Sequence, residues 1–369
     1  VPPIRMGTHD ESHFAKSSWE ASFHNNITNA IADCAFAVMN DGPAPRSYKA
    51  AMASAERKLW KRAIEDEYKN FKDAWKPIKT KGDENLLNFI LVLSKKRDAN
   101  GHVTKCKARL CIDGRLQREG IDYKETYSPV IDQAVMRMAI AIGADAGWHF
   151  AQYDFTAAFL NAGNDVRLYA RPPPGYVFPK EHVDCDAIEL TRACYGEKQA
   201  SLQWCKLVKS VLVEKLGFEE CRSAPCLFTK AATKTSPAVL TLLHVDDGII
   251  MSSSLKIMEE ILACMGKQFK IKTEPLSWHL GLKIDVNKDD IRATSPAHVQ
   301  AMLKRFGCAD ANVKETPANP DVILTKNEGA SVECQYREAV GALMCAQCTC
   351  RPDITYIVNR LARYSSNPG

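Results

Sequence analysis

Two adjacent acidic residues, Asp246 and Asp247, interrupt a stretch of β-prone apolar residues that runs from Leu240 to Met251. A buried hairpin does not tolerate two carboxylates without a counter-ion, because removing a carboxylate from water is costly. Asp-Gly is also a strong turn signal, so Asp246-Asp247-Gly248 has an alternative interpretation as a plain hairpin turn. The string therefore predicts a β-hairpin and leaves open whether its acids form the turn or bind a cation.

A third carboxylate favours the cation. Asp154 ends an apolar, strand-like segment that begins at His149. Three carboxylates that converge from a strand end and a hairpin tip can bind two Mg²⁺ ions, which also take phosphate oxygens of a substrate. Two such ions activate an attacking 3′-hydroxyl and stabilise a leaving pyrophosphate, as nucleotidyl transfer requires. Asp154, Asp246 and Asp247 are therefore predicted to be metal ligands and catalytic residues.

The rest of the pattern alternates strands and helices without a repeated unit, which favours an α+β fold. Residues 1–45 have little periodicity and are expected to form a linker or a poorly ordered extension. Residues 86–94 and 103–112 predict a hairpin around a turn at 98–101, with Lys105, Lys107 and Arg109 on one face. Helices are expected over 47–75, 130–147, 200–216 and 255–269 and after 296 and 331, and strands over 149–154, 226–230, 238–244 and 280–286.

Composition permits nucleic-acid binding without demanding it. The net charge is +5, from 49 Lys and Arg against 44 Asp and Glu, so any basic surface is local. No run of eighteen apolar residues or leader-like start is found, and we expect an intracellular chain without a membrane partner. The 14 cysteines are scattered, which is typical of reduced thiols. A zinc site at Cys345, Cys348 and Cys350 is the least supported alternative, because no second ligand pair lies nearby.

Several sequence blocks, in one order over roughly residues 45–369, resemble those of copia-type reverse transcriptases of LTR retrotransposons. A chance match across so many ordered blocks is very improbable. The blocks are Lys107-Ala108-Arg109-Leu110, Gln117 to Tyr123, Thr126 to Val130, Asp154 to Asn161, Arg171 to Gly175, Tyr195-Gly196, Lys198-Gln199-Ala200 with Trp204, Val245-Asp246-Asp247, Leu280-Gly281, and Arg351 to Ile354 running to Ser366-Asn367-Pro368.

The resemblance implies an RNA-directed and DNA-directed DNA polymerase of the right-hand type. Fingers and palm, an antiparallel sheet covered by helices, would span residues 46–285, and a partial thumb or connection would span 286–369. The implied cofactor is a pair of Mg²⁺ ions, with Mn²⁺ as a substitute. The implied partners are an RNA or DNA template with its primer, deoxynucleoside triphosphates, and the ribonuclease H and integrase regions of a parent polyprotein. Cytoplasmic virus-like particles are the implied location if the element is active.

The same resemblance implies roles for residues outside the acidic centre. Phe159 matches the aromatic ring that excludes ribonucleotides, with a core aromatic as the alternative. Lys107 and Arg109 match the basic strand that grips the triphosphate, with a solvated strand face as the alternative. The implied deoxynucleotide contacts are Lys107, Arg109, Phe155, Phe159, Tyr195 and Gly196, and the implied template or primer contacts are Lys198, Gln199, Trp278, Leu280 and Gly281.

Some positions depart from the family pattern. His244 stands where Tyr or Phe is usual, and Glu197 stands where Leu is usual and is expected to place a negative charge near a template-binding surface. The three acids remain intact. These departures support an alternative hypothesis, a catalytically eroded remnant that keeps the fold and binds nucleic acid or protein. Metal-dependent primer extension would distinguish the two hypotheses, because binding through basic residues needs no acidic triad.

Overall fold

The computed structural model describes residues 42–97, 103–234, 236–287, 290–319, 322–325, 327–329 and 335–368. The chain divides into two compact units, residues 1–126 with 159–203 and residues 127–158 with 204–369. Each unit combines helices with sheets that are mainly antiparallel, which confirms the α+β class. Almost all of the extension predicted over residues 1–45, and the turn predicted at 98–101, lie outside the described residues. The predicted boundary near residue 285 stays a prediction.

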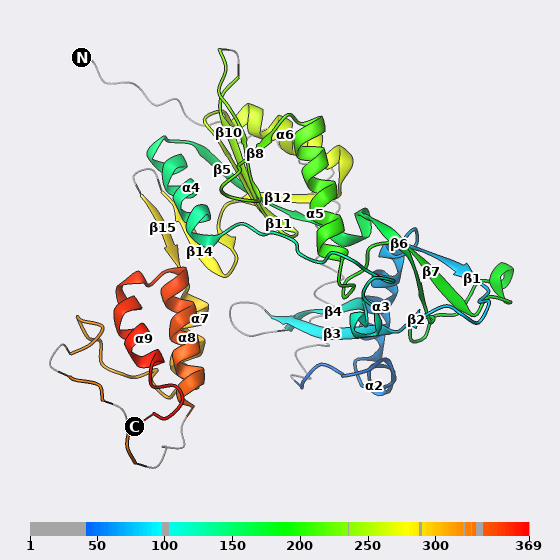
Figure 1. Ribbon diagram of the computed structural model, residues 1–369, viewed down its shortest axis with the longest axis horizontal. Coiled ribbons are helices and arrows are strands. Elements are labelled where there is room, and N and C mark those ends of the chain that lie inside the picture. The colour runs from blue at the N-terminus through cyan, green and yellow to red at the C-terminus, as the bar shows by residue number, and fades with distance from the viewer. Residues whose placement is uncertain are drawn as a thin grey trace. The chain divides into compact units, whose positions relative to one another are not determined.

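The first unit contains a four-stranded sheet and a hairpin (Figure 1). The sheet has the order β1 (Trp75–Ile78), β7 (Ala187–Arg192), β6 (Gly163–Ala170) and β2 (Leu86–Leu87). The hairpin pairs β3 (Phe89–Arg97) with β4 (Val103–Ile112), as the sequence predicted. Alternate residues of β4 are buried, so Lys105, Lys107 and Arg109 share the opposite face.

The single helix predicted over residues 47–75 is wrong. Two helices, α2 (Tyr48–Ala53) and α3 (Arg57–Asn70), occupy this segment. Ser54 adopts an extended backbone at the end of α2, and its hydroxyl donates to the Ala51 carbonyl at 2.8 Å. A serine that bonds to the preceding turn in this way competes with helix continuation, which explains the break.

The second unit is built on a six-stranded antiparallel sheet (Figure 1). Helix α4 (Gln133–Asp145) packs against one face, where Gly143 lies close to Phe150 and Met251. Helix α6 (Leu255–Gln268) also belongs to this unit. Helix α5 (Ala200–Ser210) belongs to it from Trp204 onward and continues as a π-helix over Val211–Lys215. The strand order is β12 (Ile271–Pro275), β5 (His149–Phe155), β11 (Asp247–Ser252), β10 (Val239–His244), β9 (Leu227–Lys230) and β8 (Glu219–Glu220).

A smaller sheet and three helices complete the second unit. The sheet contains β13 (Trp278–His279), β14 (Leu282–Val286) and β15 (Ile291–Thr294), and the helices are α7 (Pro296–Arg305), α8 (Tyr336–Thr349) and α9 (Thr355–Ala362).

In the two units together, short 3-10 turns occur at Gly114–Leu116, Ala158–Asn161, Lys180–His182 and Pro352–Ile354. Over the described ranges, every helix is too short or too polar to cross a membrane.

Candidate functional site

The three predicted acids lie at one end of the six-stranded sheet. Asp154 is the penultimate residue of β5 and Asp247 is the first residue of β11, and the antiparallel register places them directly opposite each other. Directly opposed side chains share one face, with Cβ atoms about 5 Å apart. Asp246 precedes Asp247 in the turn. The structure therefore brings Asp154, Asp246 and Asp247 together within the second unit.

The hairpin between β10 and β11 closes through the two-residue loop Val245-Asp246. The alternative prediction of a turn formed by Asp246-Asp247-Gly248 is therefore wrong, because Gly248 lies within β11. A Cβ added at Gly248 would overlap the ring of Tyr153, its partner on β5. Glycine is needed here for packing rather than for chain reversal.

Hydrogen bonds hold both carbonyls of this loop. The N–H of Phe155 donates to the Asp246 carbonyl at 2.8 Å, and the indole Nε1 of Trp204 donates to the Val245 carbonyl at 2.6 Å. The sequence had implied that Phe155 contacts the deoxynucleotide, but its side chain is 1% exposed and its ring centroid lies 4.9 Å from that of Trp204. Phe155 thus supports the acids from the core.

Burial and like charges together set the electrostatics of the acidic site. Burial, followed by the charges of Asp246 and Asp154, raises the pKa of Asp247, while His244 acts in the opposite direction. Within the described ranges, no group of three His, Cys, Asp or Glu side chains is arranged so that it could hold a metal ion as it stands. The donor set nevertheless fits Mg²⁺ in its chemistry, because a cation bound to these carboxylates would offset both the burial and the like-charge repulsion that raise the Asp247 pKa.

Three residues predicted to contact the deoxynucleotide meet in the first unit. The Arg109 guanidinium lies 5.0 Å from the centroid of the Tyr195 ring, and that centroid lies 4.7 Å from the centroid of the Phe159 ring. Both rings are half-buried, so Phe159 is not a fully enclosed core aromatic. Arg109, Tyr195 and Phe159 form a continuous stack, called here the gate stack. Lys107 lies two residues before Arg109 on the same face of β4.

The backbone of Tyr195 and Gly196 packs against the end of β4. The Tyr195 carbonyl accepts a hydrogen bond from the Ile112 N–H at 2.6 Å. Gly196 has a φ of 92°, and an added Cβ would overlap the Ile112 carbonyl. Glycine at position 196 therefore permits the close approach of the β4 backbone, and its implied contact with the deoxynucleotide stays a prediction.

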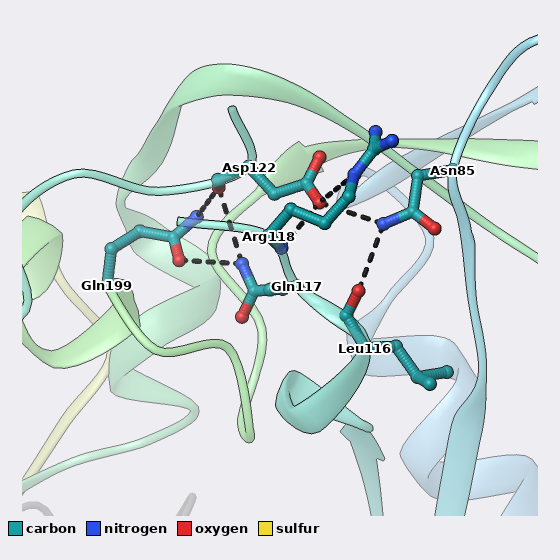
Figure 2. A network of polar contacts seen from close by, with 6 residues as sticks. All are labelled: Asn85, Leu116, Gln117, Arg118, Asp122 and Gln199. Carbon is teal, nitrogen blue, oxygen red and sulfur yellow. Dashed lines mark hydrogen bonds and ion pairs between the residues drawn. The ribbon is translucent and has the colours of Figure 1, made fainter. Parts of the chain in front are cut away.

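Figure 2 shows the polar network around Gln199. The Nε2 atom of Gln117 donates to Oε1 of Gln199 at 2.9 Å, and Oε1 of Gln117 accepts from the N–H of Lys198 at 2.8 Å. The side chain of Gln199 is only 1% exposed, because it is enclosed in this network. Its predicted contact with template or primer stays a prediction. Lys198 is exposed, and its ammonium group lies 4.8 Å from the ring centroid of Tyr123.

Asp122 anchors the loop that carries Gln117 (Figure 2). One carboxylate oxygen, Oδ2, accepts hydrogen bonds from Asn85 Nδ2 and from the Arg118 N–H, both at 2.8 Å. Asp122 is 6% exposed and is therefore a satisfied buried acid. Sequence reasoning missed the roles of Gln117 and Asp122, because the partners of Gln117 lie about eighty positions away and Asn85 lies 37 positions from Asp122, and such distant partners leave no periodic signal.

Glu197 does not place a charge at the surface, contrary to the expectation from the sequence. Its side chain is buried, and burial raises its pKa to about 8, so that the neutral form predominates at pH 7. The N–H of Cys194 donates to its Oε1 at 3.1 Å. The Oε2 atom and the Asn164 Oδ1 atom, both buried, have no hydrogen-bond partner among the described residues.

The segment predicted to grip the primer forms a tight hairpin. β13 and β14 are joined by Leu280-Gly281, whose φ angles are 49° and 80°. Positive φ at both loop residues is the type I′ geometry, which matches the twist of the strands. Trp278 is 48% exposed, and its backbone N–H donates to the side-chain carbonyl of Gln152 on β5 at 3.4 Å. The hairpin is therefore tied to the strand that carries Asp154.

The cysteines proposed as zinc ligands are free thiols. Cys345 and Cys348 are exposed on α8, and Cys350 follows that helix. Across the described ranges they belong to no group that could hold a metal ion.

Comparison with known proteins gives consistent matches. A family model described as "Reverse transcriptase (RNA-dependent DNA polymerase)" matches residues 72–320. The retrovirus-related Pol polyprotein from transposon TNT 1-94 of Nicotiana tabacum is 26% identical over 348 residues, which are 90% of this chain and 26% of that protein. The polyprotein from transposon RE2 of Arabidopsis thaliana is 30% identical over 280 residues, which are 75% of this chain and 19% of that protein.

Among solved structures, a foamy viral protease–reverse transcriptase in complex with double-stranded DNA has a TM-score of 0.40 and 12% identity, covering 90% of this chain and 47% of that one. This chain thus spans about a quarter or less of the length of the two polyproteins.

Proposed function

Because the chain belongs to the reverse transcriptase family and resembles its copia-type members, we propose that it copies RNA and DNA templates into DNA as one part of a longer retrotransposon polyprotein. The substrates would be deoxynucleoside triphosphates and a primer annealed to its template. The ribonuclease H and integrase activities would come from other regions of that polyprotein. Cytoplasmic virus-like particles are the proposed location.

The observation that carries this proposal is the register that sets Asp154 against Asp247, with Asp246 in the adjoining turn. Mg²⁺, with Mn²⁺ as a substitute, is the proposed cofactor, and these three carboxylates would hold it. When bound, the metal ions would activate the primer 3′-hydroxyl and neutralise charge on the phosphates. The protein's own task is to keep the carboxylates in position and deprotonated. Because the pKa of Asp247 is raised, protons compete with the metal at this residue as the pH falls.

The first unit would bind the incoming nucleotide. Arg109 and Lys107 supply positive charge on the outer face of β4, which suits a triphosphate. Phe159 would face the sugar and exclude a 2′-hydroxyl. In the gate stack, Tyr195 lies between the proposed triphosphate-binding residue and the proposed sugar-selecting residue. Lys198 and Trp278, both exposed, are the proposed contacts with template and primer.

The test is extension of a DNA primer on an RNA template by the full chain, with and without Mg²⁺. We expect extension by the wild type and its loss in the double variant Asp246→Asn, Asp247→Asn. Asp184→Asn, which changes an exposed aspartate of the first unit, is the matched control and should extend normally.

Absence of extension by a folded wild-type chain that still binds primer–template would contradict the proposal. It would favour the eroded remnant, for which His244, directly opposite Asp247 in the hairpin, is the first position to revert. His244→Tyr would then be expected to restore extension if this departure causes the loss.

A further inference from the structure

We propose that Trp204 is the positioning residue of the acidic hairpin: its indole N–H holds the strained Val245 backbone, and this fixes Asp246 and Asp247 beside Asp154. The consequence for catalysis rests on the proposed function, but the positioning itself does not. Trp204 lies in the second unit with all three acids, so the whole device belongs to one compact body.

The first step of the inference is the strain in the loop. Val245 has a φ of 59°. This left-handed region suits glycine or asparagine, and a β-branched side chain there is a genuine outlier. Such a conformation persists only where the surrounding structure determines it, and it is commonly found next to functional sites. Contacts from the surrounding structure must therefore hold Val245 in this conformation. Without them the loop would relax, and the position of Asp246 would change.

Two hydrogen bonds meet this requirement. The Phe155 N–H holds the Asp246 carbonyl at 2.8 Å, and the Trp204 indole holds the Val245 carbonyl at 2.6 Å. The first donor is a backbone group that almost any residue at that position would supply. The second is a side chain, and only Trp carries an indole N–H. The identity of residue 204 therefore decides whether the Val245 carbonyl is held.

The indole itself is locked in place. Trp204 is 1% exposed, and its ring centroid lies 4.9 Å from that of Phe155 and 5.2 Å from that of Phe269. Both ring pairs pack edge to face, at interplanar angles of 75° and 74°. Because the ring cannot rotate within this packing, its N–H points in one fixed direction. A fixed donor can maintain a strained acceptor, which a mobile side chain could not do.

The chain offers a matched control. Trp60, in the first unit, is 0% exposed, and its Nε1 donates to Glu56 Oε2 at 3.2 Å. Trp60→Phe removes a buried indole N–H just as Trp204→Phe does, but it leaves the acidic hairpin untouched. A difference between the two variants therefore reports on the site rather than on the general loss of a buried tryptophan.

The experiment measures amide hydrogen exchange over residues 243–250 and the binding of Mn²⁺ alone, followed by electron paramagnetic resonance, in the full chain. We expect Trp204→Phe to speed exchange in this segment and to weaken Mn²⁺ binding about 3- to 10-fold, the range set by the loss of one ordinary hydrogen bond. Trp60→Phe should match the wild type in both measurements. Unchanged exchange and Mn²⁺ binding in Trp204→Phe would overturn the inference.

A gentler variant covers the case in which Trp204→Phe fails to fold. Replacing Trp204 with 3-benzothienylalanine keeps the size of the ring and exchanges only the N–H for sulfur. The same faster exchange is expected, and wild-type protection in this variant would overturn the inference. If the wild type does not extend primers but its hairpin depends on Trp204, the proposed function fails and the positioning role stands. If Trp204→Phe extends primers with wild-type Mg²⁺ dependence, the positioning role fails and the function stands.

Discussion

Glu197 should make the first unit less stable as the pH rises, and the size of the effect follows from its burial. The carboxyl group is 6% exposed, and its pKa is raised from 4.5 to about 8, chiefly by burial. The folded chain therefore keeps a proton that the unfolded chain releases. The stability linked to Glu197 is complete below about pH 4.5 and is lost progressively as the pH rises towards 8.

The two pKa values set the magnitude. Their difference corresponds to a loss of at most about 5 kcal/mol in the free energy of unfolding, of which about 2.5 kcal/mol falls between about pH 5.5 and pH 7.5. Glu197→Gln is uncharged at every pH, and its side-chain carbonyl can still accept from the Cys194 N–H. The stability of the wild type relative to Glu197→Gln should therefore fall by about 2.5 kcal/mol over this range.

The assay is urea unfolding of both proteins at several pH values, and the difference between them cancels other titrating groups. Glu181→Gln, which alters an exposed glutamate of the same unit, is the control and should leave the pH dependence of the wild type unchanged. The difference in the free energy of unfolding between the wild type and Glu197→Gln is the measured quantity. If it stays constant within about 0.5 kcal/mol across the range, the burial argument is refuted, because a carboxyl group with an ordinary pKa is already ionised there.

Three further predictions concern the two hairpins and the gate stack. Tyr195→Ala should relax the preference for deoxynucleotides over ribonucleotides about 10-fold, because the Phe159 ring loses its packing partner, whereas Tyr195→Phe should keep the preference. The measurement is the ratio of kcat/KM for a deoxynucleotide to kcat/KM for the matching ribonucleotide. An unchanged ratio in Tyr195→Ala would contradict this role. Burial, followed by the charge of His244, lowers the pKa of His279 to about 4. The neutral ring therefore stabilises the β13–β14 hairpin above about pH 6.5, and this stability is lost as the pH falls towards 4. Amide exchange in residues 277–284 should quicken over that range, and His279→Gln should remove this pH dependence. Val245→Gly should raise the free energy of unfolding by about 1 kcal/mol, because glycine adopts the left-handed backbone without strain, and urea unfolding that shows a destabilised variant would argue against strain at this position.

Segments with a clear apolar period were predicted well. The hairpin of β3 and β4, the strand that ends at Asp154, and helices α4 and α6 lie within a few residues of their predicted bounds. Each of them buries one regular face, and the burial pattern of residues is what the sequence period reports. The convergence of the three acids followed from the same logic, since Asp154 stands near the end of its strand and Asp246-Asp247 at the tip of a hairpin.

Features that depend on partners distant in sequence were not predicted. Strand β12 was missed because it is an exposed edge strand with a mainly polar sequence, Ile271–Pro275, so it has no apolar alternation. The turn was misplaced because Gly248 looks like a turn glycine until the Tyr153 ring is seen beside it. Glu197 was expected at the surface because charge alone does not reveal burial. In each case a neighbour supplied by tertiary structure decides the outcome.

The division of the chain into units has a consequence for its synthesis. Strands β1 and β2 pair with β7 and β6, which appear only after the chain has passed through residues 127–158 of the second unit. During translation, the first unit therefore stays incomplete until about residue 192 has emerged. Until then, the apolar side chains of Trp75 and Leu87 lack the strands β7 and β6 that cover them in the folded chain. Non-local pairing of this kind is slow and exposes unpaired strand edges to aggregation. Ribosome-bound chains that end before β7 should accordingly be the species most dependent on chaperones.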